Sequence, residues 1–220
     1  MRVAVFTRTD GYRHESIEAG VGAVHALGAA DGYEALATED ADALVALLPQ
    51  VRAVIFLNTS GEVLRGAAQA AFEGFVRAGG GFVGVHAACD TGYDWPFYGA
   101  LVGAYFASHP PEVVEATVRV VDAAHPATRT LPPAWRRRDE WYDFRADPRA
   151  RPGRRVLACL DETTYEGGAM GADHPIAWCH ETLGGRAFYT GLGHPAEGFD
   201  EPLYRAHLGG GIRWALGGAS

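Results

Sequence analysis

The stretch Gly79-Gly80-Gly81-Phe82-Val83-Gly84-Val85-His86-Ala87-Ala88 contains the signals that decide the fold of this chain. The glycines end a helical pattern, and the apolar run from Phe82 to Val85 is typical of a strand buried on both faces of a sheet. Small residues follow His86, as a sharp strand-to-helix elbow requires, because the backbone is crowded there. An elbow would raise the His86 side chain above the sheet. A histidine that only caps the strand is the alternative.

Strand and helix patterns alternate upstream of this stretch. Apolar runs typical of strands occupy residues 3–6, 33–38 and 53–57. Between them and after them, apolar residues recur at helical spacing over residues 14–30, 42–48 and 65–78. Such alternation predicts a parallel sheet with right-handed crossovers, flanked by helices.

The pattern changes in the second half of the chain. We expect strands at residues 113–121, 156–160, 176–180 and 187–190, with an irregular segment over residues 124–152. Gly184-Gly185 predicts a hairpin between the last two strands, and Gly209-Gly210-Gly211 weakens a final helix expected over residues 203–216. The prediction is one α/β domain over residues 1–220. Its mostly parallel, flavodoxin-like central sheet has antiparallel additions.

Composition narrows the classes of function. The chain has 220 residues, of which 48% are apolar and 21% are charged, which indicates a globular domain with a substantial core. All 19 basic residues are arginine, so no lysine is available to form a Schiff base. The net charge of −8 and the lack of a broad basic face argue against a nucleic-acid partner.

The cysteines and the apolar runs indicate the compartment. Cys89, Cys159 and Cys179 have neither metal-binding nor disulfide spacing, so we expect free, non-catalytic thiols in a reducing environment. No signal peptide and no apolar run of membrane-spanning length are evident. We therefore expect a cytoplasmic protein without a membrane partner.

Histidines follow several predicted strands, at the edge where an open parallel sheet binds its ligands. His14, His86 and His194 follow strands, whereas His109 and His174 lie before proline. Their number near one edge favours a shared site. We expect a pool of candidate ligands for a divalent metal such as zinc, formed by His14, His86, His109 and His194. No HxH or HExxH motif supports this expectation, so it stays open.

Aromatic and acidic residues are interleaved from residue 90 onward, which suits a sugar pocket. Pyranose rings present apolar C–H faces to aromatic rings and hydroxyl groups to carboxylates. The candidate substrate-binding residues are Asp90, Trp95, His109, Trp141, Tyr142, Asp173 and His174. Any one of the aromatic residues, taken alone, fits a core position better. Asp139-Glu140-Trp141-Tyr142 is the sharpest segment, although a salt bridge to the run Arg136–Arg138 is the competing explanation for Asp139.

The elbow and the later segment Gly193-His194-Pro195-Ala196-Glu197 resemble the layout of class I glutamine amidotransferases. Those enzymes have a cysteine nucleophile at the elbow and a His-x-Glu pair after a late strand. Here His86 stands at the position of that cysteine, Cys89 lies three positions too late, and the spacing from His194 to Glu197 is one residue longer. Glutaminase chemistry is therefore not expected.

Over residues 2–216 the chain resembles the ThuA-like family, named for trehalose utilisation, which has that amidotransferase-like fold. The resemblance rests on six ordered segments, at residues 11–17, 79–88, 108–110, 139–142, 174–178 and 185–194. It implies a role in the bacterial use of trehalose and related disaccharides, beside dehydrogenases that oxidise a sugar ring at C3.

Two hypotheses of function follow. In the first, the chain is an enzyme acting on a 3-keto-glycoside, whose C3 ketone acidifies the C2 proton and allows an enediolate to form. Elimination and hydrolysis, or isomerisation, would follow. His86 or His194 is the expected base, Glu140 the expected acid, and His14 belongs to the same catalytic group. The expected ligand is a small carbohydrate and the expected pathway partner a sugar dehydrogenase. A homo-oligomer is compatible with the sequence.

In the second hypothesis, the chain is a carbohydrate-binding or regulatory module that has the same fold without catalysis. The absent cysteine nucleophile motivates this alternative. Convergence of the imidazoles discriminates between the two, because a binding module has no need to aim several titratable rings at one point. His86 and His194 lying far apart, or packed in the core, would favour the binding module.

Overall fold

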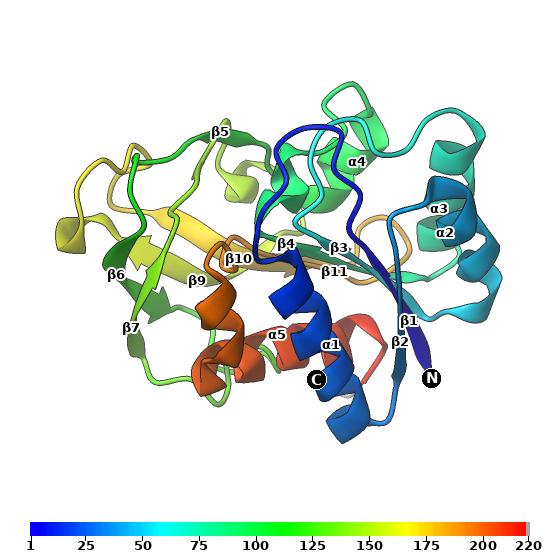
Figure 1. Cartoon of the computed structure of the whole chain (residues 1–220). Coiled ribbons are helices and arrows are strands. Elements are labelled where there is room, and N and C mark those ends of the chain that lie inside the picture. The colour runs from blue at the N-terminus through cyan, green and yellow to red at the C-terminus, as the bar shows by residue number, and fades with distance from the viewer. Residues whose placement is uncertain (219–220) are drawn as a thin grey trace.

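Five parallel strands form one half of a nine-stranded sheet in the computed structural model, which describes residues 1–218 (Figure 1). Across the sheet they are β2 (Glu34–Thr38), β1 (Arg2–Phe6), β3 (Ala53–Leu57), β4 (Gly81–Val85) and β11 (Ala187–Thr190). Every residue of β3, β4 and β11 is buried. This burial explains why these strands read as continuous apolar runs in the sequence.

Helices cover both faces of this sheet (Figure 1). On one face lie α1 (Ile17–Asp31), the 3₁₀ helix η5 (Ala196–Asp200) and α5 (Pro202–Ala215). On the other lie α2 (Ala41–Leu47), α3 (Ala67–Arg77) and α4 (Pro96–Val102). Four further 3₁₀ turns are η1 (Leu48–Gln50), η2 (His86–Asp90), η3 (Pro148–Ala150) and η4 (Glu162–Thr164). The predicted α/β class and the flanking helices are confirmed.

The other half of the sheet is antiparallel. The expected hairpin joins β10 (His174–His180) to β11, and β9 (Arg155–Asp161), β6 (Val114–Val120) and β7 (Ala134–Asp139) extend the sheet beyond it. The segment 124–152 was expected to be irregular. This prediction was wrong in part, because the segment contains β7 and β8 (Asp143–Phe144). The latter pairs with β5 (Phe106–Ser108) in a separate small sheet. Three consecutive arginines in β7 hide its alternation of buried and exposed side chains.

The three glycines of α5 do not interrupt the helix, because each permits close packing. A β-carbon at Gly210 would overlap the carbonyl oxygen of Pro126, and one at Gly211 would overlap the ring of Phe188 on β11. The low helix propensity of glycine is thus outweighed by tertiary packing, which needs the helix backbone close to its neighbours.

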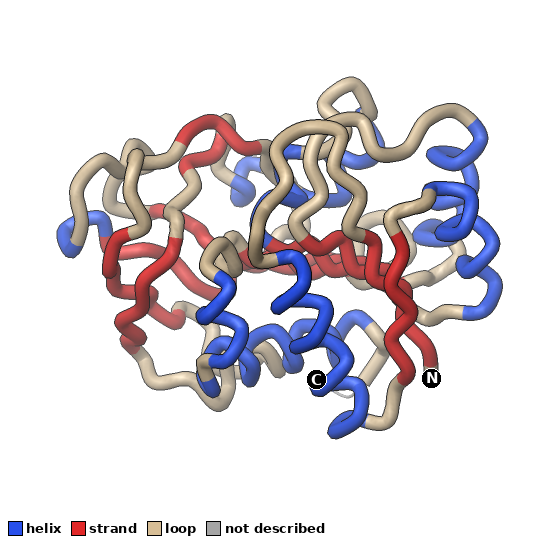
Figure 2. The backbone as a smooth tube through the Cα atoms, in the orientation of Figure 1, coloured by secondary structure: helices blue, strands red, loops and turns tan. Residues whose placement is uncertain are grey.

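Long loops gather at the carboxyl ends of the parallel strands (Figure 2). The loop after β1 and the loop after β3 run side by side, joined by a bridge between Thr9 and Ser60. The sequence pattern predicted a helix over residues 14–30, but α1 begins at Ile17. His14 therefore lies in the first of these loops. Within residues 1–218, no helix has the length and apolar character needed to span a membrane.

Candidate functional site

Five polar residues from distant segments meet at the edge where the loops gather. His14 precedes α1, His86 follows β4, His109 follows β5, Glu140 follows β7, and His194 lies in the loop after β11. All but His86 line a cavity of about 400 Å³, together with Tyr12, Asp90, Phe106 and Tyr142. His86 lies beneath the cavity, fully buried, with its ring centroid 4.1 Å from that of Tyr142.

The backbone at His86 is the expected elbow. Its φ is +46°, in the left-handed region that residues with a β-carbon rarely occupy. The Nδ1 atom of His86 donates a hydrogen bond of 2.8 Å to the carbonyl oxygen of Gly191. Since a carbonyl oxygen only accepts, Nδ1 carries the proton, and in the neutral ring Nε2 presents a lone pair to the other members of the site.

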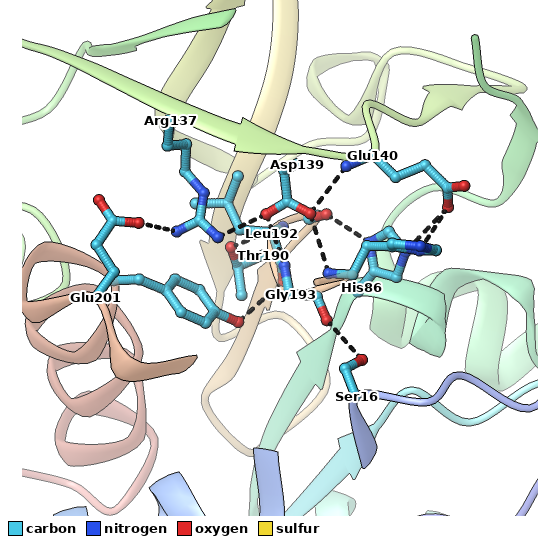
Figure 3. A network of polar contacts seen from close by, with 12 residues as sticks. Ser16, His86, Arg137, Asp139, Glu140, Thr190, Leu192, Gly193 and Glu201 are labelled. Carbon is cyan, nitrogen blue, oxygen red and sulfur yellow. Dashed lines mark hydrogen bonds and ion pairs between the residues drawn. The ribbon is translucent and has the colours of Figure 1, made fainter. Parts of the chain in front are cut away.

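Glu140 is the centre of the cluster. Its Oε2 lies 3.3 Å from Nε2 of His86 and 3.0 Å from Nδ1 of His194, and its Oε1 lies 3.3 Å from Nδ1 of His109. Burial alone would raise the pKa of Glu140, but the rings of His194 and His86 outweigh it and hold that pKa well below its usual value. Glu140 is therefore an anion at neutral pH. Figure 3 shows its carboxylate directed at the His86 ring.

The neighbouring imidazoles are tuned in opposite directions. Burial, followed by the proximity of His86 and His194, lowers the pKa of His14 to about 3, so this ring is neutral. Burial also acts to lower the pKa of His194, but the carboxylate of Glu140 outweighs it and raises that pKa above 6.5. The ring centroid of His14 lies 5.0 Å from that of His86 and 5.1 Å from that of His194.

The cluster fits a metal ion. Ligand atoms of His14, His86, Glu140 and His194 all lie within 4.8 Å of one another. Nδ1 of His14, Nε2 of His86 and Nδ1 of His194 are buried and have no hydrogen-bond partner among the described residues. Three imidazoles and one carboxylate are a common donor set for zinc and for other first-row divalent metals. His109, the fifth member of the site, is not part of this compact group.

A buried carboxylate holds the loop that carries His194. Asp139 accepts backbone hydrogen bonds of 3.0 Å from Glu140, Gly193 and His194. It also pairs with Arg137 at 2.8 Å, which confirms the salt bridge weighed for this segment, and Arg137 in turn pairs with Glu201 at 3.0 Å. Figure 3 shows Asp139 between the arginine and the loop. One carboxylate thus fixes the two segments that supply Glu140 and His194 to the cluster.

Two expected sugar-binding tryptophans do not reach the cavity. Trp141 is fully buried, and its Nε1 donates a hydrogen bond of 2.9 Å to the carbonyl oxygen of Val114. Trp95 packs in the core between Phe72 and Tyr98. Both are therefore core residues. A core position was the alternative that the sequence favoured for any single aromatic residue. The neighbours of Trp141 along the chain, Glu140 and Tyr142, line the cavity, whereas the indole ring itself is buried.

Asp173 and His174 also lie away from the cavity. Asp173 is exposed and pairs with Arg149 at 2.6 Å. His174 is buried behind Tyr142: its Nε2 donates to the Tyr142 carbonyl oxygen at 2.9 Å, and its Nδ1 lies 2.8 Å from Glu162. Because the Tyr142 oxygen only accepts, this histidine is occupied in holding the segment that presents Tyr142. Its role is therefore structural support rather than ligand contact.

Two cavity residues were not anticipated from the sequence. Tyr12 is 65% exposed, which is unusual for a tyrosine outside an interface or a binding site, and its ring lies edge-on to His14 with the centroids 4.9 Å apart. Phe106 packs on Tyr142 with centroids 4.5 Å apart. Tyr12 stands two residues before His14, so its place beside a candidate site histidine is the signal that was available.

The three cysteines are free, as expected, and all three are buried. Cys89 is completely buried on the turn that follows His86, and burial raises the pKa of its thiol. A protonated, inaccessible thiol is a poor nucleophile, so the position of Cys89 three residues after the elbow agrees with the absence of an amidotransferase nucleophile.

A family model described as ThuA, trehalose utilisation, matches residues 2–215. This chain belongs to the ThuA family. Two solved ThuA-like proteins have the same architecture. The protein from Bacteroides uniformis has a TM-score of 0.84 and 25% identity, with coverage of 98% of this chain and 91% of the other. The protein from Parabacteroides merdae has a TM-score of 0.81 and 18% identity, with coverage of 100% and 91%.

The amidotransferase-like fold of this ThuA member is also confirmed by a glutaminase structure. The glutaminase domain of CTPS from Trypanosoma brucei has a TM-score of 0.59 and 10% identity, with coverage of 100% of this chain and 95% of that domain. At this identity the likeness concerns the fold alone. A comparison with curated proteins finds no significant match.

Proposed function

We propose that this ThuA-family protein is a metal-dependent enzyme that processes 3-keto-glycosides of the trehalose type. The observation that carries the proposal is a set of three buried imidazole nitrogens without hydrogen-bond partners, from His14, His86 and His194, in residues whose ligand atoms lie within 4.8 Å of one another and of the Glu140 carboxylate. In the neutral His86 ring, Nε2 and the oxygen of Glu140 both present lone pairs at 3.3 Å, so this contact needs a positive charge, from a metal ion or from a proton on Nε2. A metal ion would also provide a partner for the buried Nδ1 of His14.

In this proposal His14, His86, Glu140 and His194 hold the metal. The hydrogen bond from His86 to Gly191 orients the His86 ring, in the way that carbonyl partners commonly orient metal-bound histidines. A metal at this place would act as a Lewis acid toward an oxygen of the sugar, which lowers the cost of forming an enediolate.

The chemistry begins at the carbon next to the ketone. A base removes the proton from C2, the electron pair forms the enediolate with C3, and the enediolate then expels the glycosidic oxygen at C1, which takes up a proton. Addition of water at C1 completes a hydrolysis, whereas return of the proton without expulsion gives an isomerised or epimerised sugar. Both outcomes share one intermediate, which is why the same groups serve either reaction.

The structure supports different roles from those expected for the proton transfers. Glu140 is an anion, so it is a poor proton donor to the leaving oxygen, and His86 is fully buried beneath the cavity. His109 and Asp90 are the imidazole and the carboxylate that line the cavity outside the metal group. We assign proton transfer to His109 and the binding of a sugar hydroxyl to Asp90, whose Oδ1 is already oriented by the hydroxyl of Tyr93 at 2.6 Å.

The alternative of a binding module without catalysis is less well supported. That alternative expects His86 and His194 to lie far apart or to pack in the core. Their ring centroids lie 5.3 Å apart, and although His86 is buried, its Nε2 contacts the Glu140 carboxylate rather than apolar side chains. A sugar-binding surface also has no use for buried imidazole nitrogens without partners, because each costs free energy unless a ligand satisfies it.

The test is to measure zinc binding by calorimetry and, separately, the products formed from 3-keto-trehalose. We expect one zinc per chain, products from the zinc-loaded protein, and none after chelation. His86→Ala should lose both zinc and turnover, and His25→Ala, which removes an exposed histidine on α1, should keep both. A wild-type protein that neither binds zinc nor converts the sugar, or a fully active His86→Ala variant, would refute the proposal.

A further inference from the structure

A second cavity of about 320 Å³ adjoins the first. The two share Tyr12 and His194, so they meet beside the proposed metal group. The second cavity lies between the loop before α1, the start of η5 and the end of β7, and its polar lining residues are Glu15, Ser16, Arg138 and Glu197. Nothing in the proposed chemistry at the first cavity uses these four residues.

We propose that the second cavity is the binding subsite for the second ring of an unphosphorylated two-ring glycoside. The ring that reacts would occupy the first cavity, and the glycosidic oxygen would lie at the junction beside Tyr12 and His194. This inference rests on the proposed function, because it assumes that the first cavity takes a sugar. Two joined cavities of similar volume are what two linked rings of similar size require.

The charges of the second cavity suit neutral hydroxyl groups. Glu15, Arg138 and Glu197 form no ion pair within residues 1–218, and Arg138 uses one nitrogen in a hydrogen bond of 3.0 Å to the carbonyl oxygen of Val113. Carboxylates accept from sugar hydroxyls and a guanidinium donates to them, so both types of group find a partner. Among the residues that line only this cavity, two carboxylates accompany one guanidinium, which favours a neutral ring over a sugar phosphate.

Tyr12 provides an apolar surface at the junction of the cavities. Its ring is largely exposed, but its backbone is fixed, because its carbonyl oxygen accepts a hydrogen bond of 2.6 Å from the hydroxyl of Ser60. An exposed aromatic ring on a fixed loop is a suitable platform for the C–H face of a pyranose, since little conformational entropy is lost on binding.

The test compares kcat/KM for 3-keto-trehalose with that for methyl 3-keto-α-glucoside, which keeps the reacting ring and lacks the second. The wild-type protein should prefer the two-ring sugar by about tenfold or more, as loss of one charge-assisted hydrogen bond predicts. Arg138→Gln and, separately, Glu197→Gln should lower this preference and leave kcat/KM for the methyl glycoside unchanged. Arg136→Gln is the matched control, because Arg136 is exposed on the same strand and lines neither cavity.

Each outcome separates the two proposals. Equal kcat/KM for both sugars in the wild-type protein, or an unchanged preference in both subsite variants, overturns the subsite and leaves the proposed function standing. Faster conversion of the 6-phosphate of 3-keto-trehalose than of the unphosphorylated sugar also overturns it. Absence of turnover with either sugar in the zinc-loaded wild-type protein refutes the proposed function, and the subsite with it.

Discussion

Replacing Asp139 with asparagine should destabilise the protein strongly, although the side chain keeps its shape. Oδ1 accepts from the backbone N–H groups of Glu140 and His194, and Oδ2 accepts from Gly193 and pairs with Arg137. Donors thus face both oxygens, so the amide NH₂ of asparagine would meet donors in either orientation. Asp139→Asn therefore loses hydrogen bonds and also leaves the guanidinium of Arg137 with one carboxylate partner fewer.

The magnitude follows from burial. Asp139 is 0% exposed and the side chain of Arg137 is 2% exposed, so little solvent screens the pair. Removing one partner of such a pair costs about 3–5 kcal/mol. For a domain of this size, a loss of about 1 kcal/mol lowers Tm by roughly 2–4 °C, which gives a fall of about 10 °C.

The assay is thermal and urea unfolding of Asp139→Asn beside Glu73→Gln. Glu73 pairs with Arg77 at 2.7 Å on the surface of α3, where a carboxylate-to-amide change should cost under about 1 kcal/mol. Zinc affinity should fall together with stability in the Asp139 variant alone, because the loop that holds His194 is released. Equal Tm values for the two variants would refute the reasoning, since burial would then make no difference.

Three other perturbations test the core. Burial lowers the pKa of His207 from 6.5 to about 4, so the unfolded chain takes up a proton first as pH falls. The free energy of unfolding measured in urea should therefore decrease from pH 6.5 to 4. The decrease should be less steep in His207→Gln. Native protein should not react with a thiol reagent until urea is added, and Cys89→Ser should retain turnover, whereas loss of turnover with an intact fold would make the thiol catalytic. Gly210→Ala should cost about 1–3 kcal/mol by overpacking, while Gly22→Ala, which has open space around it on α1, should gain up to about 1 kcal/mol; a neutral Gly210→Ala would show that α5 can move.

The parallel half of the sheet was predictable because its strands are buried on both faces. A run such as Ala53–Leu57 needs no partner information to be recognised as a buried strand. The edge strand β7 was not predictable. Its exposed positions include arginine, and its buried Arg137 forms ion pairs with Asp139 and Glu201. The pairing with Glu201 joins residues far apart in the sequence. Local periodicity does not contain that information.

The site was predictable in its histidines and not in its aromatic residues. A polar residue directly after a buried strand, such as His86, has its place fixed by strand geometry, so its nearness to His194 follows from the topology. Whether an aromatic ring near such a position faces the cavity or the core depends on the turn it occupies. Tyr142 and Trp141 are adjacent, yet one lines the cavity and the other is sealed in the core.

The left-handed backbone at His86 has a thermodynamic consequence for folding. A residue with a β-carbon in this conformation costs roughly 1–2 kcal/mol, whereas glycine would adopt it freely. Stability alone therefore does not explain an imidazole at the end of β4. The strained backbone at His86 lowers the free energy of unfolding. A ligand that binds only the folded chain would raise it by an amount that grows with the affinity of the ligand. If the proposed metal binds here, its binding and the folding of the chain would form one linked equilibrium, because His86 takes part in both.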